Sequence, residues 1–129
     1  MTALLTFLLL MPNLTCNTPI VQKAIASLRV QAVTSLLEHG IVIDWDGHDY
    51  KMRLSDGDDH SIPLTLTSQS VLMLHSHPSP YDANPSGADI KNSKQRKIPG
   101  IIVSRSGYWI VYSDGSNAPL SDPRRCTLR

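Results

Sequence analysis

Hydrophobic residues between positions 18 and 36 recur every three or four residues, which is the spacing of one face of an α-helix. Asn17-Thr18-Pro19 precedes this stretch as an N-cap with proline in the first turn, and Glu38-His39-Gly40 follows it as its end. The sequence therefore predicts an amphipathic helix of about four to five turns. Its apolar positions are Ile20, Ala24, Ile25, Leu28, Ala32, Val33 and Leu36.

The next apolar stretches have the composition of β-strands. Ile41-Val42-Ile43 is a β-branched run, and Trp45-Asp46-Gly47 forms a hairpin turn into a second strand at His48–Leu54. Val71-Leu72-Met73-Leu74 is an unbroken apolar run, which is typical of a central strand buried on both faces. These patterns predict a hairpin followed by a central strand.

The remainder of the chain predicts a second helix and a second hairpin. A polar, proline-rich loop over residues 76–85 leads into Ser86-Gly87-Ala88-Asp89, which begins a basic helix that extends to about Lys97. Ile101–Val103 and Tyr108–Tyr112 then form a closing hairpin. This order of elements predicts an α/β fold, with a small mixed sheet flanked by two helices.

Composition indicates one globular domain, which we place at residues 17–129 of the 129-residue chain. Hydrophobic residues make up 41% of the chain and the net charge is +1, so the chain is not intrinsically disordered and carries no field that attracts nucleic acid. The apolar N-terminal segment, residues 1–16, has a core at Ala3–Met11 that is too short to span a bilayer. It is either the apolar region of a signal peptide or a first strand or helical turn, so a cytoplasmic and an exported location both stay open.

Two cysteines, Cys16 and Cys126, stand near opposite ends of the chain. Two cysteines lack the paired spacings of a zinc knuckle. We expect two unrelated thiols, and a single disulfide that joins the termini is the alternative in an oxidising compartment.

The most informative stretch is His75-Ser76-His77-Pro78, followed by Ser86 and Asp89. Histidines at i and i+2 at the end of a strand point to the same side, and the proline after them ends the pairing of the strand. Asp89 lies in the first turn of a helix, where an ionised carboxylate is favoured. Two histidines and a carboxylate leave one tetrahedral position open, which is the ligand set of a catalytic zinc site. We therefore predict that His75, His77 and Asp89 bind a metal ion.

Each of these features also has a purely structural interpretation. Ser86 and Asp89 have the spacing of a capping box, and a pair of histidines at a strand end occurs by chance on many proteins. A capping box does not explain why a buried strand ends in two titratable rings, so the combination favours a site.

The same residues resemble the motif of the JAMM/MPN (JAB-type) zinc metalloproteases, which is a glutamate, then His-Ser/Thr-His-Pro, then Ser-x-x-Asp. The resemblance covers residues 18–114. Glu38, the only glutamate in the chain, stands after the first helix and close to a glycine, as in that family, while the loop between His77 and Ser86 is one residue longer than its commonest form.

This resemblance implies a cytidine-deaminase-like layout, one Zn²⁺ per chain and a compact prokaryotic, phage or toxin-associated member. It implies that a zinc-activated water hydrolyses a peptide or isopeptide bond, with Glu38 as general base and the Ser86 hydroxyl as the donor to the oxyanion. The partner would be a peptide or protein substrate, which includes ubiquitin-like conjugates. His39 is a weaker substitute for Glu38.

Three other functions compete with this one. The family contains non-catalytic members that bind partner proteins, and it also contains JAB-like domains of toxins and effectors. The third is a metal-dependent phosphoesterase or amidohydrolase that uses His-x-His. Such enzymes carry further histidines and acids downstream, and this chain has no histidine and no glutamate after Asp89.

Overall fold

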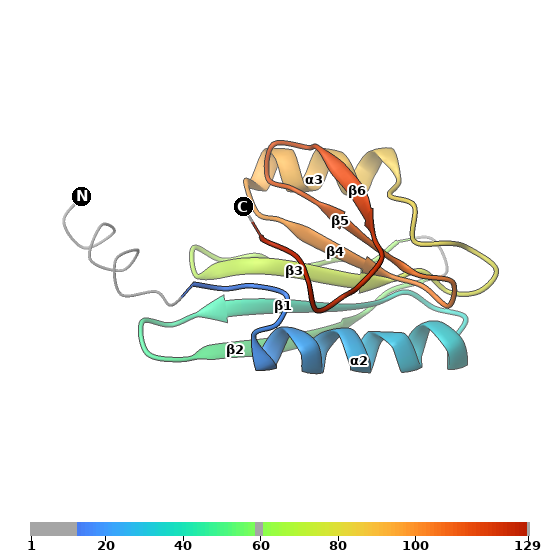
Figure 1. The fold of residues 1–129 in the computed structure, drawn as a ribbon, viewed down its shortest axis with the longest axis horizontal. Helices are drawn as coiled ribbons and strands as arrows, with labels where there is room; N and C mark the ends of the chain where they lie inside the picture. Colours follow the sequence, from blue (N-terminus) through green and yellow to red (C-terminus); the bar gives the residue numbers. More distant parts are fainter. Residues whose placement is uncertain (1–12, 59–60, 129) are drawn as a thin grey trace.

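A six-stranded sheet with the order β2-β1-β3-β4-β5-β6 lies between two helices (Figure 1). The computed structural model describes residues 13–58 and 61–128. Strands β3 and β4 are parallel, and the other neighbouring strands are antiparallel. The elements are α2 (Pro19–Thr34), β1 (His39–Trp45), β2 (Tyr50–Asp56), β3 (Ser70–Ser76), α3 (Gly87–Arg96), β4 (Gly100–Val103), β5 (Tyr108–Val111) and β6 (Asn117–Leu120). The structure thus confirms a small mixed α/β fold with two helices.

The two helices cover opposite faces of the sheet (Figure 1). The face beneath α2 forms the main core, which includes Leu28 of the helix and Ile41, Leu72 and Leu74 of the central strands. Because successive strand residues point to opposite faces, Met73 and His75 belong to the α3 side. The chemistry-bearing residues of β3 therefore face α3 and not the main core.

Helix α2 has about the predicted length but ends earlier than predicted. Thr34 is its last residue, and Ser35 already has an extended backbone with φ −114° and ψ 150°. Gly40 lies inside β1 and is not the end of the helix. Thr18 is the N-cap residue, but its hydroxyl accepts from the Thr15 N–H and caps no helix amide.

The elements around the predicted site agree with the sequence. The central strand and the second helix lie where the sequence places them, and Ser86 is the N-cap of α3. The hairpin is also present, but Trp45 belongs to β1 and not to the turn, and the second strand is Tyr50–Asp56 instead of the predicted His48–Leu54. Strand β6 was not among the predicted elements, because it has only four residues and includes Pro119. It lies at an edge of the sheet, where a proline is tolerated.

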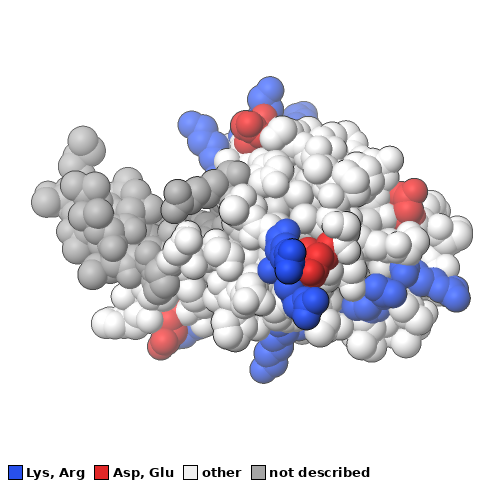
Figure 2. Space-filling view, in the orientation of Figure 1, with Lys and Arg blue, Asp and Glu red and all other residues white. Residues whose placement is uncertain are grey.

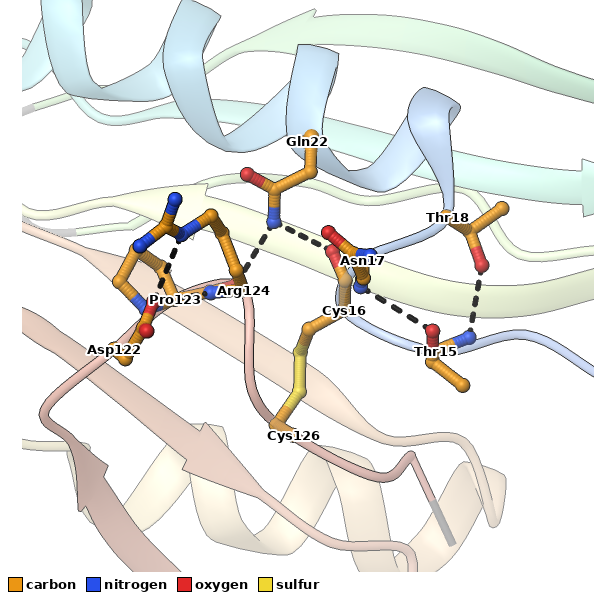
Figure 3. Close-up of a disulfide and its surroundings, with 9 residues drawn as sticks. All are labelled: Thr15, Cys16, Asn17, Thr18, Gln22, Asp122, Pro123, Arg124 and Cys126. Atoms are coloured by element: carbon orange, nitrogen blue, oxygen red, sulfur yellow. Dashed lines mark hydrogen bonds and ion pairs between the residues drawn. A yellow bond between two sulfur atoms is a disulfide. The ribbon is translucent and has the colours of Figure 1, made fainter.

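Cys16 and Cys126 form a disulfide (Figure 3), so the expectation of two unrelated thiols was wrong. Their Cα atoms lie 5.2 Å apart because the two ends of the described chain meet, with a backbone bridge between Thr15 and Thr127. The side-chain amide of Gln22 donates to the carbonyl oxygen of Cys16 at 2.6 Å and also to that of Pro123 at 2.9 Å. Pairing across 110 positions depends on the tertiary fold, which local patterns do not specify.

The alternatives for the apolar segment at Ala3–Met11 fall outside the described residues. Among the described residues, no helix has the length and apolar character needed to cross a membrane. Lys and Arg side chains are dispersed over the face drawn in Figure 2, and several lie next to an acidic side chain.

Candidate metal centre

Three separate segments bring the predicted site residues to one end of the sheet. His75 lies in β3 opposite Gly40 of β1, and continuing this antiparallel register places Glu38 beside His77. Glu38 and both histidines share the α3 face, because they alternate with residues that point into the main core. Helix α3 begins over this face and contributes Asp89 from its first turn.

The ligand atoms of these residues lie close together. The Nε2 atoms of His75 and His77 are 3.2 Å apart. Asp89 places Oδ1 at 3.2 Å from Nε2 of His75 and Oδ2 at 3.5 Å from Nε2 of His77. Glu38 Oε1 is 3.8 Å from Nε2 of His75, and one ligand atom from each of Glu38, His75 and His77 lies within 4.8 Å of the other two. This buried cluster can hold a metal ion.

The capping box of α3 fixes the orientation of Asp89. Ser86 Oγ accepts from the Asp89 N–H at 3.1 Å, and the Ser86 N–H donates to Asp89 Oδ2 at 2.8 Å. The carboxylate is thereby turned back over the helix N-terminus and towards the two imidazoles. The capping box is therefore compatible with a role of Asp89 as a metal ligand, because it directs the carboxylate towards the imidazoles.

A backbone carbonyl fixes the orientation of the His77 ring. Nδ1 of His77 lies 2.6 Å from the carbonyl oxygen of Asp82. A carbonyl only accepts, so Nδ1 carries a proton, and Nε2 faces the cluster, where it donates to Asp89 when the ring is charged and presents a lone pair when the ring is neutral. This is the arrangement in which a histidine ligates a metal.

Electrostatic interactions within the cluster are strong. Burial raises the pKa of Glu38, and the nearby His75 and His77 oppose that effect. Burial also disfavours the charged forms of His77 and Asp89. For His77, the hydrogen bonds with Asp89 and with the Asp82 carbonyl, together with the nearby carboxylates, outweigh burial and raise the pKa. For Asp89, the hydrogen bonds with His75 and His77, together with the charge of His75 and the Ser86 N–H, outweigh burial and lower the pKa. Asp89 is accordingly an ionised carboxylate that faces the histidines.

Glu38 is held by its backbone and not by the preceding helix. Its N–H donates to the carbonyl oxygen of Asp58 at 2.6 Å, and its carbonyl oxygen accepts from the Gly57 N–H at 2.8 Å. His39, the weaker candidate, uses both ring nitrogens elsewhere, with Nδ1 at 2.8 Å from Asp56 and Nε2 at 2.8 Å from Ser35. Glu38 is therefore the residue of this pair that joins the histidines.

Two hollows adjoin the cluster, and Glu38, Ser86 and Asp89 line both of them. The first, of about 160 Å³, extends from His75 between α3 and residues 61–66. The second, of about 440 Å³, extends from His77 along the loop at residues 78–84. The cluster therefore has an open hollow on each side.

Some residues that shape the site were not predicted. Ser76, between the two histidines, is fully buried and accepts from the His39 N–H at 3.0 Å. The contribution of Asp82 is a backbone carbonyl, which leaves no mark in the sequence. The alternation of Ile62, Leu64 and Leu66 with polar residues was the available sign of the segment that walls the first hollow.

Two aspartates near the β1–β2 turn take part in local hydrogen bonds and not in the site. Asp46 accepts from the backbone of His48 and Asp49 in the turn before β2, as its turn composition predicts. Asp44 lies in β1 and accepts from Arg53 at 2.6 Å. Comparison with protein-family models and with curated proteins finds no match for this sequence.

Proposed function

We propose that this protein is a zinc-dependent metallopeptidase or isopeptidase of JAMM/MPN type. The observation that carries the proposal is the convergence of His75, His77, Asp89 and Glu38, with nitrogen and oxygen atoms 3.2 to 3.8 Å apart. Glu38, His75, Ser86 and Asp89 also border an open hollow, so a substrate can reach the site.

The donor set fits Zn²⁺. A tetrahedral zinc with bonds of 2.0–2.1 Å separates its ligand atoms by about 3.3 Å. The separations of 3.2 Å between the two Nε2 atoms, and of 3.2 and 3.5 Å from these to the Asp89 oxygens, lie near that value. Two imidazoles and a carboxylate are ligands that zinc accepts, whereas calcium and magnesium prefer oxygen alone.

Asp89 is the better third ligand, and Glu38 is the better base. Asp89 lies closer to both imidazoles than Glu38 Oε1 lies to His75, and its pKa is lowered, which favours the anion that a metal binds. His75, His77 and Asp89 would hold the ion. A zinc ion bound there supplies Lewis acidity, which makes water nucleophilic at neutral pH and polarises a carbonyl group.

The residues of the chain account for the proton transfers. Glu38, at the edge of the cluster, accepts the proton of the attacking water through its carboxylate oxygen and delivers it to the leaving amine. The Ser86 hydroxyl, whose oxygen accepts from the Asp89 N–H, retains its own proton and donates it to the carbonyl oxygen as negative charge develops there.

Zinc content tests the first part of this proposal. We expect about one zinc per chain in wild-type protein purified without chelator, and almost none in His75→Ala/His77→Ala. Asp89→Asn should lose most of the metal, while Glu38→Gln should keep it and lose hydrolysis of peptide or isopeptide substrates. His48→Ala, in the exposed turn before β2, is the matched control and should bind zinc normally. Zinc-free wild-type protein would reject the proposal, and full hydrolysis by Glu38→Gln would reject Glu38 as the base.

A further inference from the structure

The first hollow is a groove that begins at the catalytic cluster. Its lining includes Glu38, His75 and Asp89 at one end and Arg96 of α3. One wall is α3 and the other is the segment at residues 61–66, and residues of β3, β4 and β5 form the floor. The groove is therefore continuous with the atoms that would perform hydrolysis.

Apolar side chains make up about half of the inner surface of the groove, and polar and charged side chains make up the rest. Ile62, Leu64 and Leu66 alternate with exposed neighbours and line the wall, while Met73, Ile102 and Val111 lie in the floor. The wall rests directly on β1 because Gly40 has no side chain. A Cβ at Gly40 would lie 2.5 Å from a methyl group of Leu64 and 2.8 Å from one of Ile62. An apolar side chain next to the scissile bond would be buried here.

The wall at residues 61–66 also has backbone groups that can bind a ligand. Within residues 13–58 and 61–128, no hydrogen bond joins the backbone of residues 62–66 to another residue. Pro63 has no N–H, but the other N–H groups and the C=O groups of this segment can pair with an extended chain. The shape and the backbone therefore suit an extended peptide better than a compact ligand.

Arg96 is placed to select charge in that peptide. It follows Asp89 by seven residues, which is about 10 Å along the helix axis. An extended chain covers this distance in about three residues. Among the described residues, no carboxylate lies within ion-pair distance of Arg96. Lys91 lies on the same helix but does not line the groove.

We propose that the groove binds an extended peptide with apolar side chains beside the scissile bond and a carboxylate about three residues away, which Arg96 holds. This inference rests on the proposed function for the position of the scissile bond. The carboxylate belongs either to an aspartate or glutamate side chain or to the C-terminus of the substrate.

Affinity selection from randomised octapeptides tests the inference without turnover. The bait is the Glu38→Gln protein, which keeps the proposed metal ligands, and one library has free C-termini while the other is amidated. We expect enrichment of Leu, Ile, Val or Met, with an acidic group about three positions from the apolar pair. Enrichment of acidic side chains in both libraries identifies a side-chain carboxylate, and a requirement for the free C-terminus identifies the terminal one.

Variants at Arg96 then assign the charge selection. Adding the Arg96→Gln substitution to the Glu38→Gln bait should weaken binding of the selected acidic peptide about tenfold or more. The preference for apolar residues should stay unchanged. Arg96→Glu should select basic residues instead, and Lys91→Gln should behave as the unmodified bait does. No selective enrichment, or the same acidic preference without Arg96, overturns the inference. If the peptide binds but zinc-loaded wild-type protein does not hydrolyse it, the proposed function fails while the groove assignment stands.

Discussion

The hydroxyl of Ser76 accepts a hydrogen bond from the backbone N–H of His39 at 3.0 Å, and so ties the strand of the two histidines to the residue after Glu38. The same hydroxyl lies 3.4 Å from the carbonyl oxygen of His39, to which it donates. Because Ser76 is fully buried, this contact fixes the register of Glu38 relative to His75 and His77. Ser76 is thus a positioning residue for the proposed base.

Replacing Ser76 should separate the base from the metal ligands. We expect Ser76→Ala to lower the free energy of unfolding by about 1–3 kcal/mol, because a buried backbone N–H loses its partner. It should also reduce turnover while zinc binding persists, and Ser76→Thr should restore turnover because it retains the hydroxyl. Urea denaturation, zinc content and hydrolysis rates measure these effects.

Ser104→Ala is the matched control for that change. Ser104 is also fully buried, and its hydroxyl accepts from the N–H groups of Ser106 and Gly107 within the turn before β5, so it holds that turn and not the strand of Glu38. It should lose stability without a change in turnover per folded molecule. Equal losses of turnover in Ser76→Ala and Ser104→Ala would show that Ser76 has only a structural role.

Gly57 should resist substitution because backbone atoms crowd it. A Cβ at Gly57 would clash with the carbonyl oxygen of Ser61 and lie 2.8 Å from Cα of Ile62. Gly57→Ala should therefore displace the backbone that holds Glu38 and destabilise the fold by about 1–3 kcal/mol, the usual cost of overpacking. Gly87→Ala, at the start of α3 with open space around it, should be neutral or slightly stabilising. Thermal unfolding of both variants tests this expectation. If Gly57→Ala were as stable as Gly87→Ala, the backbone near Gly57 would have to relax without cost.

The disulfide should contribute strongly to stability because it closes a long loop. Cys16 and Cys126 are 110 positions apart, and the chain-entropy model gives about 5 kcal/mol for a loop of this size. Cys16→Ser/Cys126→Ser should lower the free energy of unfolding by up to that amount, measured by urea denaturation against oxidised wild-type protein. The intact mass of oxidised wild-type protein should rise by about two mass units on reduction, since each thiol gains one hydrogen. Two titratable thiols in native, oxidised protein would contradict the bond.

Much of the proposed centre could be predicted because its signals are local. The spacing of His75 and His77 on a strand, and of Ser86 and Asp89 at a helix start, fixes their relative directions within each element. Glu38 was identified by resemblance and by its uniqueness, and the register of Gly40 with His75 brings it to the histidines. The local geometry that these two patterns predict is present in the folded chain, whereas the pattern Glu38-His39-Gly40 does not end the first helix, which stops at Thr34.

The features that were missed depend on tertiary contacts. The disulfide requires the two ends of the chain to meet, and β6 is a short strand that pairs only with β5 at a sheet edge. Ile62 and Leu64 lie outside any strand, and they line the groove because Gly40 leaves room for them. In these cases the partner residue, and not the local pattern, determines the structure.

Stability at acid pH should depend on Asp44 in β1. Arg53 donates to its carboxylate at 2.6 Å and Ser70 at 2.7 Å. The hydrogen bond from Arg53 lowers the pKa of Asp44, burial opposes this, and Ser70 adds to the lowering. Folding therefore stabilises the ionised form of Asp44. In the unfolded chain the same aspartate has a pKa of about 3.9. The contribution of Asp44 to the free energy of unfolding is fully present above about pH 4, and it is lost as the pH falls through the pKa that Asp44 has in the folded protein.

Asp44→Asn removes this dependence. At pH 7 we expect the variant to be less stable by about 1.5–3 kcal/mol, which is the range for hydrogen bonds to charged groups. The difference from wild-type protein should shrink as the pH falls below about 4, because Asp44 itself then becomes neutral. Asp49→Asn, at an exposed position in the neighbouring turn, is the control and should show no such convergence. Urea denaturation from pH 3 to pH 7 measures both, and a stability gap for Asp44→Asn that stays constant over this range would show that the Asp44 charge does not stabilise the fold.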